Sequence, residues 1–245
     1  MNREIAIKSS LRGLKAYELS CSNPKYIMCC VHGIGEYFLR YERMSEILEE
    51  YGIKMIGMDL RGHGATEGKP GHCAPRTDVL SDIDGMLEYA MENYPGLPII
   101  LYGHSMGGNI GLDYRYRGRL NGVPCAYVIS APWIKLVRPV TGALYHTVNL
   151  MSKILPSLTI GSDIDETILG NPKLVTGYND DPMTHNKISL QTAIEGFSIG
   201  GKTATSQKLP RGSGKYIASF IGFSSVENPQ VIAMCLIDEP EGVYY

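Results

Sequence analysis

Residues Gly103 to Gly107, which read Gly-His-Ser-Met-Gly, most strongly limit how this chain can fold. The apolar run Pro98 to Tyr102 precedes them, and a segment compatible with a helix follows. Glycines spaced in this way around a serine are typical of a sharp turn from a strand into a helix, which exposes the serine hydroxyl at the end of a sheet. The pattern therefore predicts a nucleophilic serine, Ser105, on a strand-to-helix turn.

Apolar runs alternate with helical patterns along the first half of the chain. The runs bounded by Gly, Pro or charged residues are Tyr26 to Val31, Lys54 to Met58, Pro98 to Tyr102 and Ala126 to Ile129. Such runs are typical of buried parallel strands, and residues 41–51 and 78–94 between them carry apolar residues at helical spacing. Two short antiparallel strands are expected before them, over Ile5 to Lys8 and Leu14 to Leu19. The alternation predicts a doubly wound α/β sheet.

The composition and charge of the chain indicate which kinds of molecule it binds. A chain of 245 residues with 44% hydrophobic residues can bury a large core. A formal net charge of −2, with mixed charges, argues against a nucleic-acid surface. Met1 to Ser10 hold no continuous apolar segment, no run approaches the roughly 18 residues of a membrane span, and the six cysteines follow no zinc or disulfide spacing. We therefore expect a soluble cytoplasmic protein that acts on a small molecule without a metal or cofactor.

The pattern changes after Pro132. From Trp133 to about Ala193, prolines interrupt short helical patterns, which predicts a helical insertion over the sheet. Beyond residue 195 the chain becomes rich in glycine and basic residues, and the runs Tyr216 to Phe223 and Gln230 to Ile237 then predict an antiparallel hairpin. We divide the chain into a core (1–132), a cap (133–194) and a C-terminal segment (195–245).

Two backbone amides are candidates to stabilise an oxyanion beside the serine. A serine nucleophile needs an adjacent base and backbone donors for the oxyanion that forms. The amide of Met106, directly after the nucleophile, is the first candidate. The His-Gly loop Val31 to Gly35 offers the amide of Ile34 as the second.

The base is harder to place. Hydrolases with this turn carry an acid and then a histidine later in the chain, yet no histidine follows His185. His63 lies between two glycines and fits a loop-shaping role better than a catalytic one. His104 is expected to point away from the serine and to be packed or hydrogen-bonded locally, and His185 to be exposed to solvent or to form a capping hydrogen bond. The acid and the histidine of a triad therefore stay unassigned.

Several segments, the turn included, form a longer pattern. They are Val31 to Glu36, Asp59 to Gly64 followed by Glu67-Gly68, Gly103 to Gly108, and Ser130 to Pro132. With them, residues 1 to about 194 resemble the monoacylglycerol lipases of the α/β-hydrolase superfamily. The resemblance implies an α/β-hydrolase sheet with a helical cap, an acyl-enzyme at Ser105, and oxyanion amides at Ile34 and Met106. It also implies a carboxylic ester or acyl-chain substrate and a cap that faces the acyl chain and transiently contacts a lipid surface.

The C-terminal segment departs from that family, whose members continue with a strand ending in a Gly-x-x-Asp loop and then a histidine loop. Gly200 to Thr205, Tyr216 to Phe223 and Ile237 to Pro240 instead resemble the C-terminal part of a penicillin-binding protein transpeptidase. Ala204 replaces the glycine of its Lys-Thr-Gly motif. The chain thus resembles a fusion of two truncated proteins, in which an antiparallel β-hairpin replaces the later hydrolase strands. Asp238, at the end of an apolar run, mimics a strand-end triad aspartate by position only.

Three functional interpretations follow. The first is a serine hydrolase of carboxylic esters whose turnover is impaired because the triad Asp and His segment is missing. The second is a non-catalytic protein that binds an acyl ligand, and the third is a fusion product without a function of its own. Penicillin binding is disfavoured, because Ser22 to Lys25 fits Ser-x-x-Lys only by letters, holds a proline and precedes a strand, and no Ser-x-Asn occurs.

Overall fold

The computed structural model describes residues 2–133, 142–162, 177–196, 199–207, 216–224 and 231–238, with side chains placed in 2–133, 145–162 and 177–196. Asp238 lies among the residues with a described backbone, so its predicted likeness to a triad acid falls outside the described side chains.

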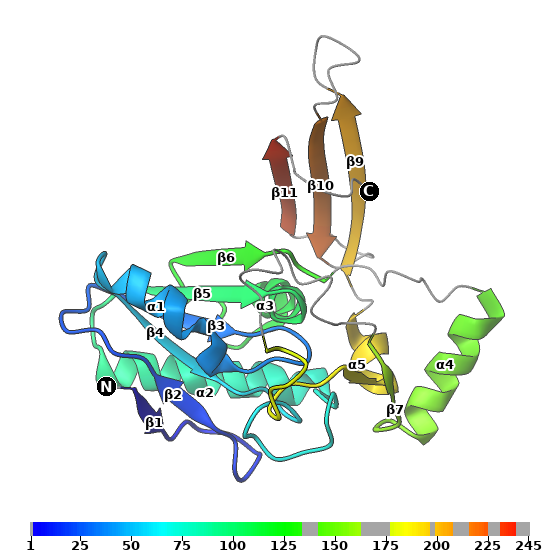
Figure 1. Cartoon of the computed structure of the whole chain (residues 1–245), viewed down its shortest axis with the longest axis horizontal. Helices are drawn as coiled ribbons and strands as arrows, with labels where there is room; N and C mark the ends of the chain where they lie inside the picture. Colours follow the sequence, from blue (N-terminus) through cyan, green and yellow to red (C-terminus); the bar gives the residue numbers. More distant parts are fainter. Residues whose placement is uncertain are drawn as a thin grey trace.

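A six-stranded sheet forms the centre of the fold (Figure 1). Its strands are β1 (Arg3–Ile5), β2 (Ala16–Glu18), β3 (Tyr26–Val31), β4 (Ile53–Met58), β5 (Ile99–His104) and β6 (Ala126–Ser130). Their spatial order is β1-β2-β4-β3-β5-β6. The strands β4, β3, β5 and β6 pair in parallel, as the sequence predicts, while β1 and β2 join them antiparallel.

The first strand ends earlier than predicted. β1 stops at Ile5, and the chain then leaves the sheet to cross α2 (Arg76–Asn93). A Cβ on Gly85 of α2 would lie 1.9 Å from the carbonyl oxygen of Lys8, so the crossing is close. The ammonium of Lys8 forms ion pairs with Glu88 and Glu92 at 2.9 and 3.2 Å. These contacts with the helix replace the strand pairing expected for residues 6–8.

Helices cover both faces of the sheet, because the strand residues alternate between two apolar clusters. Ile27, Cys29 and Val31 of β3 pack in the cluster that includes residues of α2 and α3 (Met106–Arg117). Met28 and Cys30 face the other side, where they pack with Phe38 of η1 (Phe38–Tyr41) and with residues of α1 (Glu42–Glu49). The predicted layers of a doubly wound sheet are therefore present.

The cap contains more than the predicted helices. Its described elements are α4 (Gly142–Ile154), β7 (Thr159–Gly161), β8 (Lys187–Ser189) and α5 (Leu190–Glu195). β7 and β8 form an antiparallel pair that the sequence analysis did not predict. Ser189 caps α5, since its hydroxyl accepts a hydrogen bond from the Thr192 amide.

The C-terminal segment forms a separate antiparallel sheet of β9 (Ile199–Gln207), β10 (Tyr216–Ser224) and β11 (Val231–Asp238). Pairing from Ile217–Asp238 to Ser224–Val231 confirms the predicted hairpin. β9 extends it by a third strand that contains the Lys-Thr-Gly-like segment.

Candidate active site

Ser105 is the single residue between the end of β5 at His104 and the start of α3 at Met106. Its φ and ψ are 53° and −115°, a combination that residues other than glycine rarely adopt. The adjoining strand holds this strained backbone, because the Ser105 amide donates to the carbonyl of Ser130 on β6 at 3.0 Å. The Ser105 carbonyl in turn accepts from the amides of Asn109 and Trp133 at 3.1 and 2.8 Å. The half-buried serine thus lies on the predicted sharp turn.

Both glycines that flank Ser105 are needed for the turn. A Cβ on Gly103 would lie 2.3 Å from the carbonyl oxygen of Gly107. A Cβ on Gly107 would lie 1.9 Å from the carbonyl oxygen of Val31 at the end of β3. The first turn of α3 therefore packs directly against the backbone where the His-Gly loop begins.

The loop after β3 reaches the nucleophile. A Cβ built on Gly33 would lie 3.2 Å from the Ser105 Cβ, which places the loop beside the serine. The Gly33 amide is occupied, because it donates to Oε1 of Glu36 at 2.6 Å. The Ile34 amide is therefore the better oxyanion donor of the two.

His32 fixes the direction of the Ile34 amide. Nε2 of His32 accepts from the Leu60 amide at 2.8 Å, so Nδ1 carries the proton and donates to the Gly33 carbonyl at 2.7 Å. Because the C=O and N–H of one trans peptide point in opposite directions, the Ile34 N–H points away from His32. The roles of Ile34 and Met106 as oxyanion donors stay predictions that this geometry supports.

All six histidines lie in the described part of the chain, and none forms a hydrogen bond with the Ser105 hydroxyl there. His104 pairs through Nδ1 with the Ser130 hydroxyl at 3.1 Å, and His72 pairs with the Ser189 hydroxyl at 2.9 Å. Nε2 of His185 lies 3.1 Å from the Gly62 carbonyl oxygen. The ring of His146 contacts that of Tyr145. The two remaining histidines, His32 and His63, are buried.

His63 is a poor candidate for a base. It is 1% exposed, and its ring centroid lies 5.4 Å from that of His32 and 4.6 Å from that of His185. Burial lowers the pKa of His63 well below its usual value, and the two neighbouring imidazoles lower it further. The flanking glycines, Gly62 and Gly64, have φ of 67° and 52°. This arrangement supports the predicted loop-shaping role.

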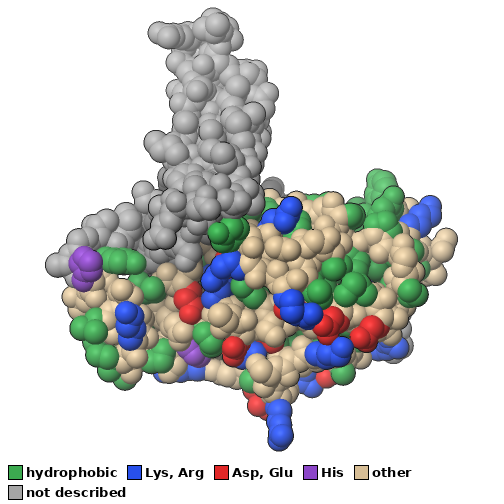
Figure 2. Space-filling model, turned by 180° about the vertical axis from the view of Figure 1, so that it is seen from behind, with side chains coloured by type: hydrophobic (Ala, Val, Ile, Leu, Met, Phe, Trp, Pro, Cys, Tyr) green, Lys and Arg blue, Asp and Glu red, His purple; other side chains and the backbone are tan. Residues whose placement is uncertain are grey.

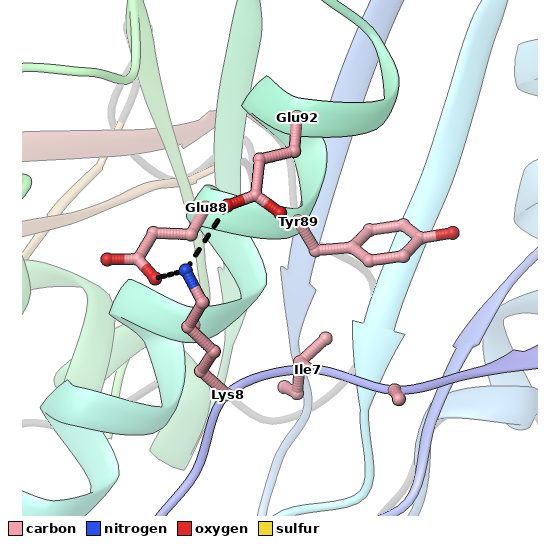
Figure 3. Close-up of a pocket in the computed structure, with 7 residues that line it drawn as sticks. Ile7, Lys8, Glu88, Tyr89 and Glu92 are labelled. Atoms are coloured by element: carbon pink, nitrogen blue, oxygen red, sulfur yellow. Dashed lines mark hydrogen bonds and ion pairs between the residues drawn. The ribbon is translucent and has the colours of Figure 1, made fainter.

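A cavity of about 250 Å³ lies elsewhere, between residues 6–8 and α2 (Figure 3). Three charged side chains line it, and the ammonium of Lys8 forms ion pairs with both Glu88 and Glu92. None of the predicted site residues lines it. The described residues also contain no cluster of His, Cys, Asp or Glu that could hold a metal ion. The candidate site is therefore the turn at Ser105 with the adjoining loop.

Sequence reasoning missed the side chains that hold this loop. Glu36 accepts from both the Gly33 amide and the Tyr41 hydroxyl, the latter at 2.8 Å. The three-residue spacing from Gly33 to Glu36 could have indicated this contact. Tyr178 and His185 of the cap also contact the loop, from a part of the chain where the sequence holds no corresponding pattern.

The chain is similar in sequence to a known family and to several known proteins. The family described as serine aminopeptidase, S33, matches residues 22–209. A monoacylglycerol lipase of Mycolicibacterium smegmatis is 28% identical over 67% of this chain and 58% of its own length. The human monoglyceride lipase is 32% identical over 65% of this chain and 52% of its own. The matched region thus spans little more than half the length of these two relatives.

A solved structure agrees with the sequence comparisons. The monoacylglycerol lipase of Paleococcus ferrophilus superposes with a TM-score of 0.62 at 27% identity, over 75% of this chain and 70% of that one. The monoglyceride lipase of Saccharomyces cerevisiae, at 22% identity and a TM-score of 0.62, shares the fold. The family match over residues 22–209, together with this fold, shows that the chain belongs to the serine aminopeptidase S33 family of α/β-hydrolases.

Proposed function

We propose that this chain is a serine hydrolase of carboxylic esters, similar to monoacylglycerol lipases, that forms its acyl-enzyme at Ser105. The observation that carries the proposal is the strained Ser105 backbone beside the loop of Gly33 and Ile34. In this scheme the Ser105 oxygen attacks the ester carbonyl as its proton passes to water, and the alcohol leaves after its oxygen takes a proton from water. A second water molecule then hydrolyses the acyl-enzyme and releases the carboxylic acid. The amides of Ile34 and Met106 stabilise the oxyanion between these steps.

Turnover is impaired in this proposal, because the serine lacks a histidine partner in the described part of the chain. Removing the base of a serine triad lowers kcat by a factor on the order of 10⁶, while oxyanion donors and binding retain roughly 10³ to 10⁴ over water. The same observation favours the alternative, a non-catalytic protein that retains an acyl-ligand site under the cap.

The cap (133–194) fits a role at a lipid surface. Its exposed apolar side chains gather along the end of α4 and β7, where Leu150, Ile154 and Ile160 are 60%, 62% and 52% exposed. Figure 2 shows hydrophobic side chains at this end of the molecule, with a basic and a histidine side chain among them, and further hydrophobic side chains at the opposite end of the same face. None of the helices in the described ranges is long and apolar enough to cross a membrane. Transient contact with lipid and a cytoplasmic location are part of the proposal.

The proposal treats residues 195–245 as a fragment of transpeptidase-like sequence joined to the hydrolase core (1–132) and cap. The three-stranded antiparallel sheet of β9 to β11 is compatible with this origin, since it lacks a parallel crossover within the described strands. Amplification of the genomic locus across codons 190 to 205 tests whether the two parts are joined in the gene.

Chemical rescue tests the function. Purified protein is treated with a fluorophosphonate probe, with and without added imidazole, and the labelled residue is identified by mass spectrometry. We expect slow labelling of Ser105 that imidazole accelerates, because a small base can take the position of the missing side chain. The matched control, Ser105→Ala, abolishes labelling, and p-nitrophenyl butyrate is not measurably hydrolysed without imidazole.

Each other outcome rejects a part of the proposal. Ester hydrolysis at ordinary lipase rates without imidazole, abolished by Ser105→Ala, would show that a base is present. Absence of labelling in both conditions, with saturable binding of a fluorescent fatty acid, would replace the hydrolase by the acyl-binding alternative.

A further inference from the structure

The carbonyl of Gly35, at the end of the oxyanion loop (residues 33–36), is bound by the base of the cap (residues 177–189). The hydroxyl of Tyr178 and the amide of His185 both donate to it, each at 3.0 Å. Gly35 has φ of 74°, and a Cβ there would lie 2.1 Å from the His185 carbonyl oxygen and 2.7 Å from the Tyr178 hydroxyl. Only glycine lets the two segments approach this closely.

The two halves of the loop are held by different parts of the molecule. The Gly33 side is bound within the core, through Glu36 on its amide and His32 on its carbonyl. The Gly35 side is bound by the cap through Tyr178 and His185. Because Ile34 lies between these two attachments, its amide direction depends on both. A shift of residues 177–189 at the base of the cap would therefore allow the oxyanion loop to pivot at Gly35.

Tyr178 is well placed to transmit such a shift. It is 4% exposed, and the guanidinium of Arg40 stacks over its ring, 5.0 Å from the centroid. Burial raises the pKa of Tyr178 to about 12, so the hydroxyl remains a donor near neutral pH. Asp181 attaches the same part of the cap to the core at a second point, away from the oxyanion loop, because it accepts from the Tyr37 hydroxyl at 2.8 Å and lies 3.8 Å from Arg40.

We propose that Tyr178 is a positioning residue whose hydroxyl couples the docking of the cap base to the orientation of the Ile34 amide. The proposal rests on the proposed function, because the orientation of Ile34 matters to chemistry only if Ser105 reacts. Removal of the hydroxyl leaves the Gly35 carbonyl with the His185 amide alone. The oxyanion loop then samples directions in which Ile34 points away from Ser105.

The test compares Tyr178→Phe with Tyr37→Phe. Each removes one hydroxyl between the core and the cap base, but only the first removes a bond to the oxyanion loop. Backbone ¹⁵N relaxation gives the order parameters of Ile34 and Gly35, which do not require a reactive serine. We expect these to fall from about 0.85, the value of rigid backbone, to below about 0.7 in Tyr178→Phe and to stay unchanged in Tyr37→Phe.

Imidazole-assisted labelling by the fluorophosphonate is the second readout. Loss of one hydrogen bond of ordinary strength predicts about a fivefold lower maximal labelling rate in Tyr178→Phe, with the probe concentration for half-maximal rate unchanged. Tyr37→Phe should label as the wild type does. A purely structural role would instead lower the melting temperature of both variants and leave the labelling rates equal.

The two failures are distinguishable. Unchanged order parameters at Ile34 and Gly35 in Tyr178→Phe, or equal losses in both variants, would overturn the positioning role whatever the reactivity. A wild-type protein that is never labelled, with the order parameters changed as expected, would overturn the hydrolase function and leave the coupling of cap and loop in place.

Discussion

Replacing Asn109 by alanine should loosen the cap from the helix that begins at the nucleophile. Asn109 is 1% exposed and lies in the first turn of α3. Its Nδ2 donates to the carbonyl of Trp133, where the cap begins, and to that of Gly196, two residues after the cap ends, at 2.8 and 3.0 Å. Its Oδ1 accepts from Nη2 of the buried Arg76 at 2.8 Å. One side chain thus joins the residues that flank the cap to α3.

The cost follows from the groups left without partners. Nη1 of Arg76 already lacks a hydrogen-bond partner in the described part of the chain, so Asn109→Ala would leave a second nitrogen of this buried cation, Nη2, without its partner. Each orphaned buried polar group costs about 1–3 kcal/mol, and the two carbonyls can recover part of this from water. We expect a loss of about 4 kcal/mol in the free energy of unfolding, a large share of the 5–15 kcal/mol typical of a domain.

The assay uses the only tryptophan, Trp133, which reports from the contact itself. Urea unfolding followed by its fluorescence gives the free energy by linear extrapolation. Asn121→Ala is the matched control. This half-buried asparagine makes solvent-exposed hydrogen bonds to the carbonyls of Arg115 and Tyr116 at 3.1 and 3.4 Å, and their loss should cost less than about 0.5 kcal/mol. Equal stabilities of the two variants would refute the reasoning, because the buried bonds would then contribute nothing.

Three further predictions use the same purified protein. Stability should fall as the pH drops below about 6.5, because the unfolded chain takes up a proton that the buried His63 cannot; His63→Gln should flatten this part of a melting-temperature profile. Gly107→Ala should prevent folding of the turn and lower yield or melting temperature sharply, whereas Gly122→Ala, with open space around its Cβ, should match the wild type in circular dichroism. Ile154→Asp should weaken co-sedimentation with phosphatidylcholine vesicles severalfold, whereas Ile47→Asp should not, although Ile47 of α1 is similarly exposed. Equal binding of the two variants would reject the proposal that the cap contacts lipid.

The central sheet is well predicted from the sequence, because each of its buried strands is marked by the residues of that strand alone. A parallel strand buried on both faces needs a continuous apolar run, and Tyr26 to Val31 supplies one within six residues. The strands β7 and β8 lack such a run, since each spans three residues and exists through pairing with a distant partner, Thr159 with Ser189. Their stability comes from contacts that no local pattern records.

The same contrast explains what could be predicted of the site. Ser105 and its flanking glycines form one short motif, so the turn is evident from the sequence. The contact of Tyr178 with Gly35 joins residues 143 positions apart. Nothing in the sequence around Tyr178 distinguishes it from the other tyrosines, so its role becomes visible only when the cap base is placed against the loop.

The geometry of the nucleophile does not depend on whether a base is present. The contacts that hold Ser105 come from Val31, Gly103, Gly107, Ser130 and Trp133, and none of these lies beyond the first residue of the cap. A chain that keeps β3, β5, β6 and α3 will therefore keep the strained serine, even where a triad histidine has no counterpart. For this reason the turn shows descent from a hydrolase fold, while turnover has to be decided by the reactivity of Ser105 itself.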